Sequence, residues 1–162
     1  MATIIKPPNK IKTGYSIFIA GSIEEGKAVD WQTKIEKALS KSDIIIYNPR
    51  RDDWDSTWVQ SIDNPQFRGQ VEWELEAQEK ATIIVMYFDP KTKSPISLLE
   101  LGLFGKDRKM IVCCPKGFWR KGNVDVVCNR YDINQVDTLD KLIDIIVKID
   151  KKIKKFRGKN GK

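Results

Sequence analysis

The sequence predicts one α/β domain in which a parallel sheet of about five strands is covered by helices on both faces. Short apolar runs without polar alternation recur along the chain, which is typical of strands buried on both faces. Segments with helical spacing of apolar residues separate these runs, and such alternation implies right-handed βαβ units. With 162 residues, the chain can bury the core that a three-layer domain needs.

Each expected element follows from a local pattern. The apolar runs predict strands at 15–20, 44–47, 81–88, 110–114 and 131–136. Helices are expected at 28–40, 66–80, 94–105, 124–130 and from Thr138 onward, where Thr precedes an apolar periodic segment and is a typical N-cap. Residues 1–14 are polar, contain two adjacent prolines and are expected to form a loose leader, so that a single domain spans 15–150.

The positive charge of the chain is concentrated at its end. There are 29 Lys and Arg residues against 22 Asp and Glu, a formal net charge of +7. Seven of the basic residues lie in 151–162, which contains no acid, so the rest of the chain is formally neutral. This tail could contact nucleic acid non-specifically, but a solvated, disordered end is the simpler interpretation.

Several classes of chemistry are excluded by composition. The chain has no histidine, which rules out His general bases, Ser/His and Cys/His nucleophile pairs and most zinc sites. The three cysteines lack metal-ligand spacing and suit a reducing compartment. No apolar run approaches the length of a membrane helix, and we expect a cytoplasmic protein without membrane contact, metal or organic cofactor.

The segment 94–105 carries the most informative pattern. Ser94 and Pro95 suit the N-cap and first position of a helix, and Gly105 suits its end. Glu100 is the only charged residue between Ser94 and Gly105 and shares the spacing of an apolar stripe formed by Ile96, Leu99 and Leu103. Burying a lone carboxylate is costly, which favours a chemical role, although a structural partner is the alternative.

A ligand site is expected at one edge of the sheet. The loops after 20, 47, 88 and 114 all leave the carboxyl ends of predicted strands, where α/β sheets bind ligands. Residues 21–28 nearly match a phosphate-binding P-loop, but Ala28 stands where Ser or Thr should hold Mg²⁺. Glu24 and Glu25 would repel phosphate oxygens, which argues against an NTPase.

The carboxylates near this edge suggest glycosyl transfer. A pair of carboxylates around an acetal-like carbon can supply a nucleophile and a proton donor. Glu100 is the candidate nucleophile, and Glu72 and Glu74 flank Trp73 on the preceding helix. Candidates for stacking on or hydrogen bonding to a base lie around the following loop, namely Asn48, Arg50, Trp54, Trp58 and Phe67.

The chain is similar to the nucleoside 2-deoxyribosyltransferase-like proteins in five segments that occur in the same order. These segments are 16–23, 48–54, 70–75, 94–102 and 114–124. The resemblance implies a flavodoxin-like fold and a double displacement in which Glu100 attacks C1′ of a 2′-deoxynucleoside. A covalent deoxyribosyl intermediate is then resolved by a second base or by water. The family's acid falls on Glu74, Ser94 replaces an Asp, and the family's first-strand tyrosine is absent at Ile17 and Phe18.

The resemblance also implies binding residues and partners. Gly21, Ser22 and Ser94 are expected to contact the sugar, and the loop containing Asn48, Arg50, Asp53 and Trp54 the base. A homo-oligomer is expected, with Asn123 and Arg120 acting on a neighbour's site. Two alternatives stay open. One is a deoxynucleotide N-glycosidase that only hydrolyses, with Arg50, Arg51 or Lys27 holding a 5′-phosphate, and the other is a non-catalytic nucleotide-binding module.

Overall fold

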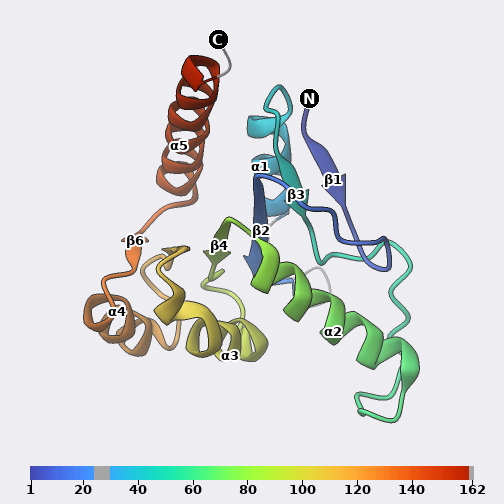
Figure 1. Cartoon of the computed structure of the whole chain (residues 1–162). Helices are drawn as coiled ribbons and strands as arrows, with labels where there is room; N and C mark the ends of the chain where they lie inside the picture. Colours follow the sequence, from blue (N-terminus) through green and yellow to red (C-terminus); the bar gives the residue numbers. More distant parts are fainter. Residues whose placement is uncertain (24–29, 161–162) are drawn as a thin grey trace.

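The computed structural model describes residues 1–23 and 30–160, and this part of the chain forms a six-stranded sheet in which every pairing is parallel (Figure 1). The strands are β1 (Thr3–Ile5), β2 (Ser16–Gly21), β3 (Ile45–Tyr47), β4 (Ile83–Tyr87), β5 (Met110–Cys113) and β6 (Asn134–Val136). Their order across the sheet is β1-β3-β2-β4-β5-β6. All five expected strands are confirmed, and β1 is a sixth.

The helices lie close to where the sequence predicts them. They are α1 (Trp31–Leu39), α2 (Pro65–Lys80), α3 (Pro95–Phe104), α4 (Lys121–Arg130) and α5 (Leu139–Asn160), with a short 3-10 helix η2 (Gly105–Asp107) after α3. Side-chain oxygens cap three of them: Asp30 accepts from the Thr33 N–H, Asn64 from the Phe67 N–H and Thr138 from the Lys141 N–H. The start of the expected helix at residue 28 lies outside the described residues.

The sheet separates two apolar layers. Successive residues of β2 point to opposite faces, as the pleat requires. Phe18 and Ala20 join the cluster that packs under α2, α3 and α4, whereas Ile17 and Ile19 join the cluster under α1 and α5 (Figure 1). The order of β3-β2-β4-β5-β6 is the flavodoxin-like order, so the predicted three-layer fold is confirmed.

The expected loose leader is instead part of the sheet. β1 pairs in parallel with β3, and Ile5 and Ile11 are buried in the core. The Trp73 indole N–H donates to the Asn9 carbonyl, which fixes the connection between β1 and β2. β1 is a short edge strand with one neighbour, and of its three residues only Ile5 is buried.

The expected disordered tail is also wrong for residues 151–160, which continue α5. Asp150 is buried and accepts from the Ser42 hydroxyl at 2.7 Å and from the Lys154 ammonium at 2.9 Å. The Arg157 guanidinium lies 5.3 Å from the Tyr15 ring centroid. The basic residues therefore extend a helix that is anchored to the body, and the tail is not a free polycation.

Candidate active site

The candidate site begins at the carboxyl ends of β2 and β4. The chain moves to one side of β2 to form β3 and then crosses to the other side to form β4, so these two central strands meet at the topological switch point. Ser22 follows β2 directly, and its N–H donates to the Tyr87 carbonyl at the end of β4. This is the edge at which the sequence predicts ligand binding.

Three buried hydroxyls meet at this edge. The Oγ atoms of Ser22 and Ser94 and the Oγ1 atom of Thr92 lie 2.5–2.8 Å from one another. The Asp89 N–H donates to the Ser22 Oγ at 2.9 Å, which ties the cluster to the end of β4. Ser22 and Ser94, both expected to contact a sugar, are thus brought together, and Thr92 is a partner that the sequence reasoning missed.

Ser94 starts α3 but does not cap it as predicted. Its φ is +48°, in the left-handed region, and its side chain makes no capping hydrogen bond. The hydroxyl lies instead against Ser22 and Thr92. The αL turn therefore directs this side chain back to the sheet edge, and α3 begins at Pro95 as expected.

Glu100 is buried, but not on the stripe that the sequence predicts. Ile96, Leu99 and Leu103 are between 54% and 60% exposed, whereas Glu100 is only 7% exposed. The buried face of α3 consists of Ser97, Glu100, Leu101 and Phe104, which follow the same helical spacing one position later. The prediction that Glu100 shares a buried face with Ile96, Leu99 and Leu103 is therefore wrong, because these three side chains point outward.

The Glu100 carboxyl faces α2 and has a neutral partner. The Gln78 side-chain amide donates to its Oε1 at 2.8 Å, and no Lys or Arg pairs with it within the described ranges. Burial raises the pKa of Glu100 to about 8, the nearby Glu74 carboxyl adds to the rise, and the Gln78 hydrogen bond opposes it.

Glu74 is the second carboxyl of the site. The Gln70 amide donates to its Oε1 at 2.6 Å, and burial raises the pKa of Glu74 to about 7. The residue keeps some solvent exposure, unlike Glu100, so it is better placed to exchange a proton with water. Interacting carboxyls titrate as a pair, and with both pKa values raised the pair retains a proton at neutral pH. One acid and one carboxylate side by side is an arrangement suited to acid-assisted nucleophilic displacement.

Glu72, the other carboxyl candidate on α2, lies on a different side of the helix from Glu74, with Trp73 between them in sequence. Trp73 is buried against Phe18 and Tyr47, with ring centroids 6.5 Å apart in each pair. Glu72 points to the opposite side, is exposed and pairs with Arg68 at 3.6 Å. Glu72 is therefore not part of the site, because adjacent helical positions project about 100° apart and only Glu74 faces α3.

Within the loop after β3, most of the polar side chains already have partners. Asn48 donates its amide to Glu36 at 2.7 Å and accepts from the Arg50 N–H, so it shapes the turn. Arg50 lies 3.5 Å from Asp30, an ion pair at the surface. The predicted base contacts from Asn48 and Arg50 would need these bonds to be exchanged or shared.

The tip of this loop forms an aromatic cluster. Trp54 is exposed and packs edge-on against Trp58, with centroids 5.1 Å apart. The Arg51 guanidinium lies 4.9 Å from the Trp58 ring and pairs with Asp53 at 2.8 Å. Asp53 thus holds Arg51, and Trp54 retains a free face on which a planar ligand could stack.

Gly21 is required by packing. Its φ is +139°, and a Cβ atom here would lie 2.2 Å from the Tyr87 carbonyl oxygen. Glycine at this position allows β2 and β4 to approach each other closely. This packing accounts for Gly21 without any contact to a ligand. Of the segment 21–28 that resembles a P-loop, residues 24–28, including Lys27, lie outside the described part of the chain.

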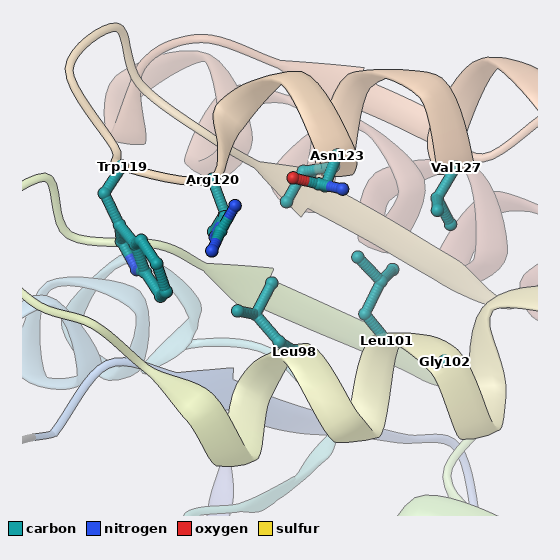
Figure 2. A pocket seen from close by; sticks show the side chains of 8 residues that line it. Leu98, Leu101, Gly102, Trp119, Arg120, Asn123 and Val127 are labelled. Atoms are coloured by element: carbon teal, nitrogen blue, oxygen red, sulfur yellow. The ribbon is translucent and has the colours of Figure 1, made fainter.

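Asn123 and Arg120 lie on the other side of α3. Figure 2 shows them lining an apolar groove of about 320 Å³ between α3 and α4, together with Leu98, Leu101, Gly102, Trp119, Val124 and Val127. Glu100 does not line this groove and faces α2 instead. Asn123 therefore lines a groove that does not include Glu100.

The glutamines that donate to the two carboxyls, Gln70 and Gln78, were not singled out from the sequence. Their spacing of four residues on either side of Glu74 places all three on one face of α2, and this was the available signal. Among residues 1–23 and 30–160, no group of His, Cys, Asp and Glu side chains could hold a metal ion. No helix of the described chain is long and apolar enough to cross a membrane.

Comparison with known proteins agrees with this geometry. A family model described as "nucleoside 2-deoxyribosyltransferase like" matches residues 14–118, which contain the switch point, the hydroxyl cluster and both carboxyls. No curated protein matches the chain.

Proposed function

Because the chain belongs to the nucleoside 2-deoxyribosyltransferase-like family, we propose that it is a glycosyl-transfer enzyme in which Glu100 is the nucleophile. The observation that carries the proposal is the buried carboxyl pair. Glu74 on α2 lies near enough to Glu100 on α3 for its charge to raise the pKa of Glu100. Each carboxyl is bonded to one glutamine amide and neither to a cation in the described structure. A fold that buries two carboxyls without a counter-charge bears a cost that a catalytic role explains.

The proposed first step transfers deoxyribose to the protein. The two carboxyls share one proton at neutral pH, and the reactive form is the one in which this proton lies on Glu74 and Glu100 is ionised. The Glu100 carboxylate then attacks C1′ of a 2′-deoxynucleoside and forms an ester bond. The bond between C1′ and the base nitrogen breaks, and its electron pair leaves with the base. Glu74 gives its proton to the departing base, which lowers the cost of the leaving group.

In the proposed second step, another base or a water molecule attacks C1′ on the opposite side. The ester bond breaks, its electrons return to Glu100, and Glu74 takes the proton of the incoming group. The two displacements together retain the configuration at C1′. The Ser22 and Ser94 hydroxyls lie at the sheet edge beside α3, where we assign them to the sugar.

Base exchange is the test of this proposal. The protein is incubated with a mixture of deoxynucleosides and free bases, and mass spectrometry follows new nucleosides, free deoxyribose and the protein itself. We expect the rate of base release to fall by several orders of magnitude in Glu100→Gln. Nucleoside binding should be largely preserved, since a nucleophile acts mainly in the transition state. Full activity in this variant would rule out the mechanism, and binding without base release in the wild type would identify a non-catalytic module.

The hydrolytic alternative is separated by the same experiment. Free deoxyribose without base exchange identifies an N-glycosidase, and stronger competition by a 5′-monophosphate than by the bare nucleoside identifies a nucleotide substrate. Arg51 is already paired with Asp53 and packed against Trp58. Arg50, half-exposed at the end of β3, is the better candidate for a phosphate contact.

A homo-oligomer is the proposed functional form. The outward face of α3 has no charged residue and exposes Ile96, Leu99 and Leu103. The adjoining groove is lined by Asn123 and not by Glu100. A second copy docked on this face would bury the apolar side chains and could bring its own Asn123 to the site.

A further inference from the structure

A regular ladder of polar side chains runs along one face of α2. Gln70, Glu74 and Gln78 follow each other at intervals of four residues, which is one helical turn. Gln70 donates to Glu74 Oε1 at 2.6 Å, and Gln78 donates to Glu100 Oε1 at 2.8 Å. Each carboxyl of the site therefore receives one amide from the same helix.

The backbone around these glutamines is fixed. Gln70 Nε2 also donates to the Pro49 carbonyl at 3.0 Å, which links Glu74 to the loop after β3. The Lys109 ammonium donates to the backbone carbonyls of Gln78, Glu79 and Ala81 at 2.7, 2.9 and 3.3 Å. The end of α2 is thus pinned at the residue that contacts Glu100.

These glutamines are costly if their role is only structural. Gln78 is completely buried and its Oε1 atom has no hydrogen-bond partner, and the same is true of the Oε1 atom of the buried Gln70. An unsatisfied buried amide oxygen destabilises a fold, and an apolar side chain of similar shape would avoid this. The benefit must therefore come from the amide hydrogens and the carboxyls that they face.

The surroundings of Glu100 explain why an amide is useful there. Across α2 it faces Glu74, a like charge, and within the described chain no cation reaches it. Lys109 is occupied by backbone carbonyls of α2. Both forms of the Glu100 carboxyl can accept a hydrogen bond from the Gln78 amide, but the bond to the charged carboxylate is the stronger one, so this contact favours the ionised form.

We propose that Gln78 is a positioning residue that stabilises the ionised form of Glu100 and orients it for attack, while Gln70 serves the proton donor Glu74. This inference rests on the proposed function. Both glutamine amides are neutral. They therefore stabilise the ionised carboxylate without forming an ion pair, which would reduce the nucleophilicity of the carboxylate. Gln78 acts through its hydrogen bond to the Glu100 carboxyl, and no contact of its own with the substrate is proposed.

The test compares two matched substitutions, Gln78→Met and Gln70→Met, which remove the amide and keep a flexible side chain of similar length. We expect Gln78→Met to lower kcat by roughly 10- to 100-fold near neutral pH, the effect of losing one hydrogen bond to a charged group, with little change in KM. The acidic limb of its pH–rate profile should move to higher pH, and part of the activity should return in alkaline buffer. Gln70→Met should instead slow substrates whose base is a poor leaving group.

A readout independent of activity accompanies the kinetics. The titration of Glu100 is followed by NMR with ¹³C-labelled glutamate side chains, its resonance assigned by its loss in Glu100→Gln. We expect the pKa of Glu100 to rise in Gln78→Met and to stay near the wild-type value in Gln70→Met. If Gln78→Met does not fold, Gln78→Glu keeps the shape and should raise this pKa further through a second like charge.

The two proposals fail in different ways. A wild-type protein without base release, together with a raised Glu100 pKa in the variant, removes the proposed function but keeps the role of Gln78 in holding the charge. An active wild type whose acidic limb, kcat and Glu100 titration are unchanged in both Gln78 variants would overturn the inference.

Discussion

Replacing Glu100 by Gln should stabilise the protein, and the gain should grow with pH. The carboxyl has an ordinary pKa of 4.5 in the unfolded chain and a pKa of about 8 in the folded protein, raised mainly by burial. Below pH 4.5 the carboxyl is protonated in both states and has no effect. Above that pH the unfolded chain ionises first, so the stability of the folded state falls as the pH rises toward 8. The Gln side chain cannot ionise and still accepts the amide hydrogen of Gln78.

The size of the effect follows from the gap between the two pKa values. Each unit corresponds to about 1.4 kcal/mol, which gives an upper bound of roughly 5 kcal/mol for the full gap. Part of the rise in the pKa of Glu100 is caused by the charge on Glu74 and not by burial. Relaxation of the site around the ionised carboxylate further reduces the free energy that the pKa gap represents. We therefore expect Glu100→Gln to raise the free energy of unfolding by about 2–4 kcal/mol at pH 9 and by less than about 1 kcal/mol at pH 5.

Urea unfolding followed by tryptophan fluorescence measures this difference. Wild type, Glu100→Gln and the control Glu72→Gln are compared at pH 5, 7 and 9, at one ionic strength and one protein concentration. Glu72 is an exposed acid on α2, and its substitution should stay within about 0.5 kcal/mol at every pH. A difference between Glu100→Gln and wild type that does not change between pH 5 and 9 would refute the claim that a lone carboxyl is buried at the site.

Three further outcomes are expected. Glu74→Gln should slow release of poor leaving bases by about 10²–10⁴-fold and affect good leaving groups much less, which a series of nucleosides with bases of different basicity would show. Gly21→Ala should destabilise the protein by more than about 3 kcal/mol, or prevent folding, because its Cβ would lie 2.2 Å from the Tyr87 carbonyl oxygen; urea unfolding or the yield of folded protein measures this. Leu99→Lys combined with Leu103→Lys should leave the fold intact and lower the mass of the particle in analytical ultracentrifugation.

Each of these outcomes has a clear contradiction. Equal slowing of good and poor leaving groups would remove Glu74 as the proton donor. An Ala at position 21 with wild-type stability would mean that β2 and β4 are not in the close contact described here. An unchanged particle mass in the double lysine variant would place the subunit interface elsewhere. Gly102→Ala, on the groove side of the same helix, is the control for helix integrity.

The sheet could be predicted because its strands are buried on both faces. Continuous apolar runs such as those of β2 and β4 have few alternative structures, and all five expected strands occur. β1 escaped prediction because three residues between polar and proline-rich sequence do not show a pattern. The helical end of α5 was not predicted because the hydrogen bond that anchors it joins Ser42 and Asp150, which are 108 residues apart in the sequence.

The site could be predicted only in part. Burial of Glu100 was expected, but α3 is apolar on nearly all sides, with Leu98, Leu101 and Phe104 between the stripe residues, so periodicity could not fix which face turns inward. The pairing of Gln78 with Glu100 joins two helices and depends on how they cross. Local spacing shows the ladder on α2, but only tertiary packing shows what the ladder faces.

The central claim, that Glu100 forms a bond to the sugar, is tested most directly by peptide mass spectrometry of the trapped protein. The protein is mixed with a 2′-deoxynucleoside, quenched in acid within the first turnover, digested and sequenced by fragmentation. We predict a mass increase of one deoxyribosyl group on the peptide that contains Glu100, absent in Glu100→Gln. An active enzyme that never carries this adduct, or that carries it on another residue, would contradict the account.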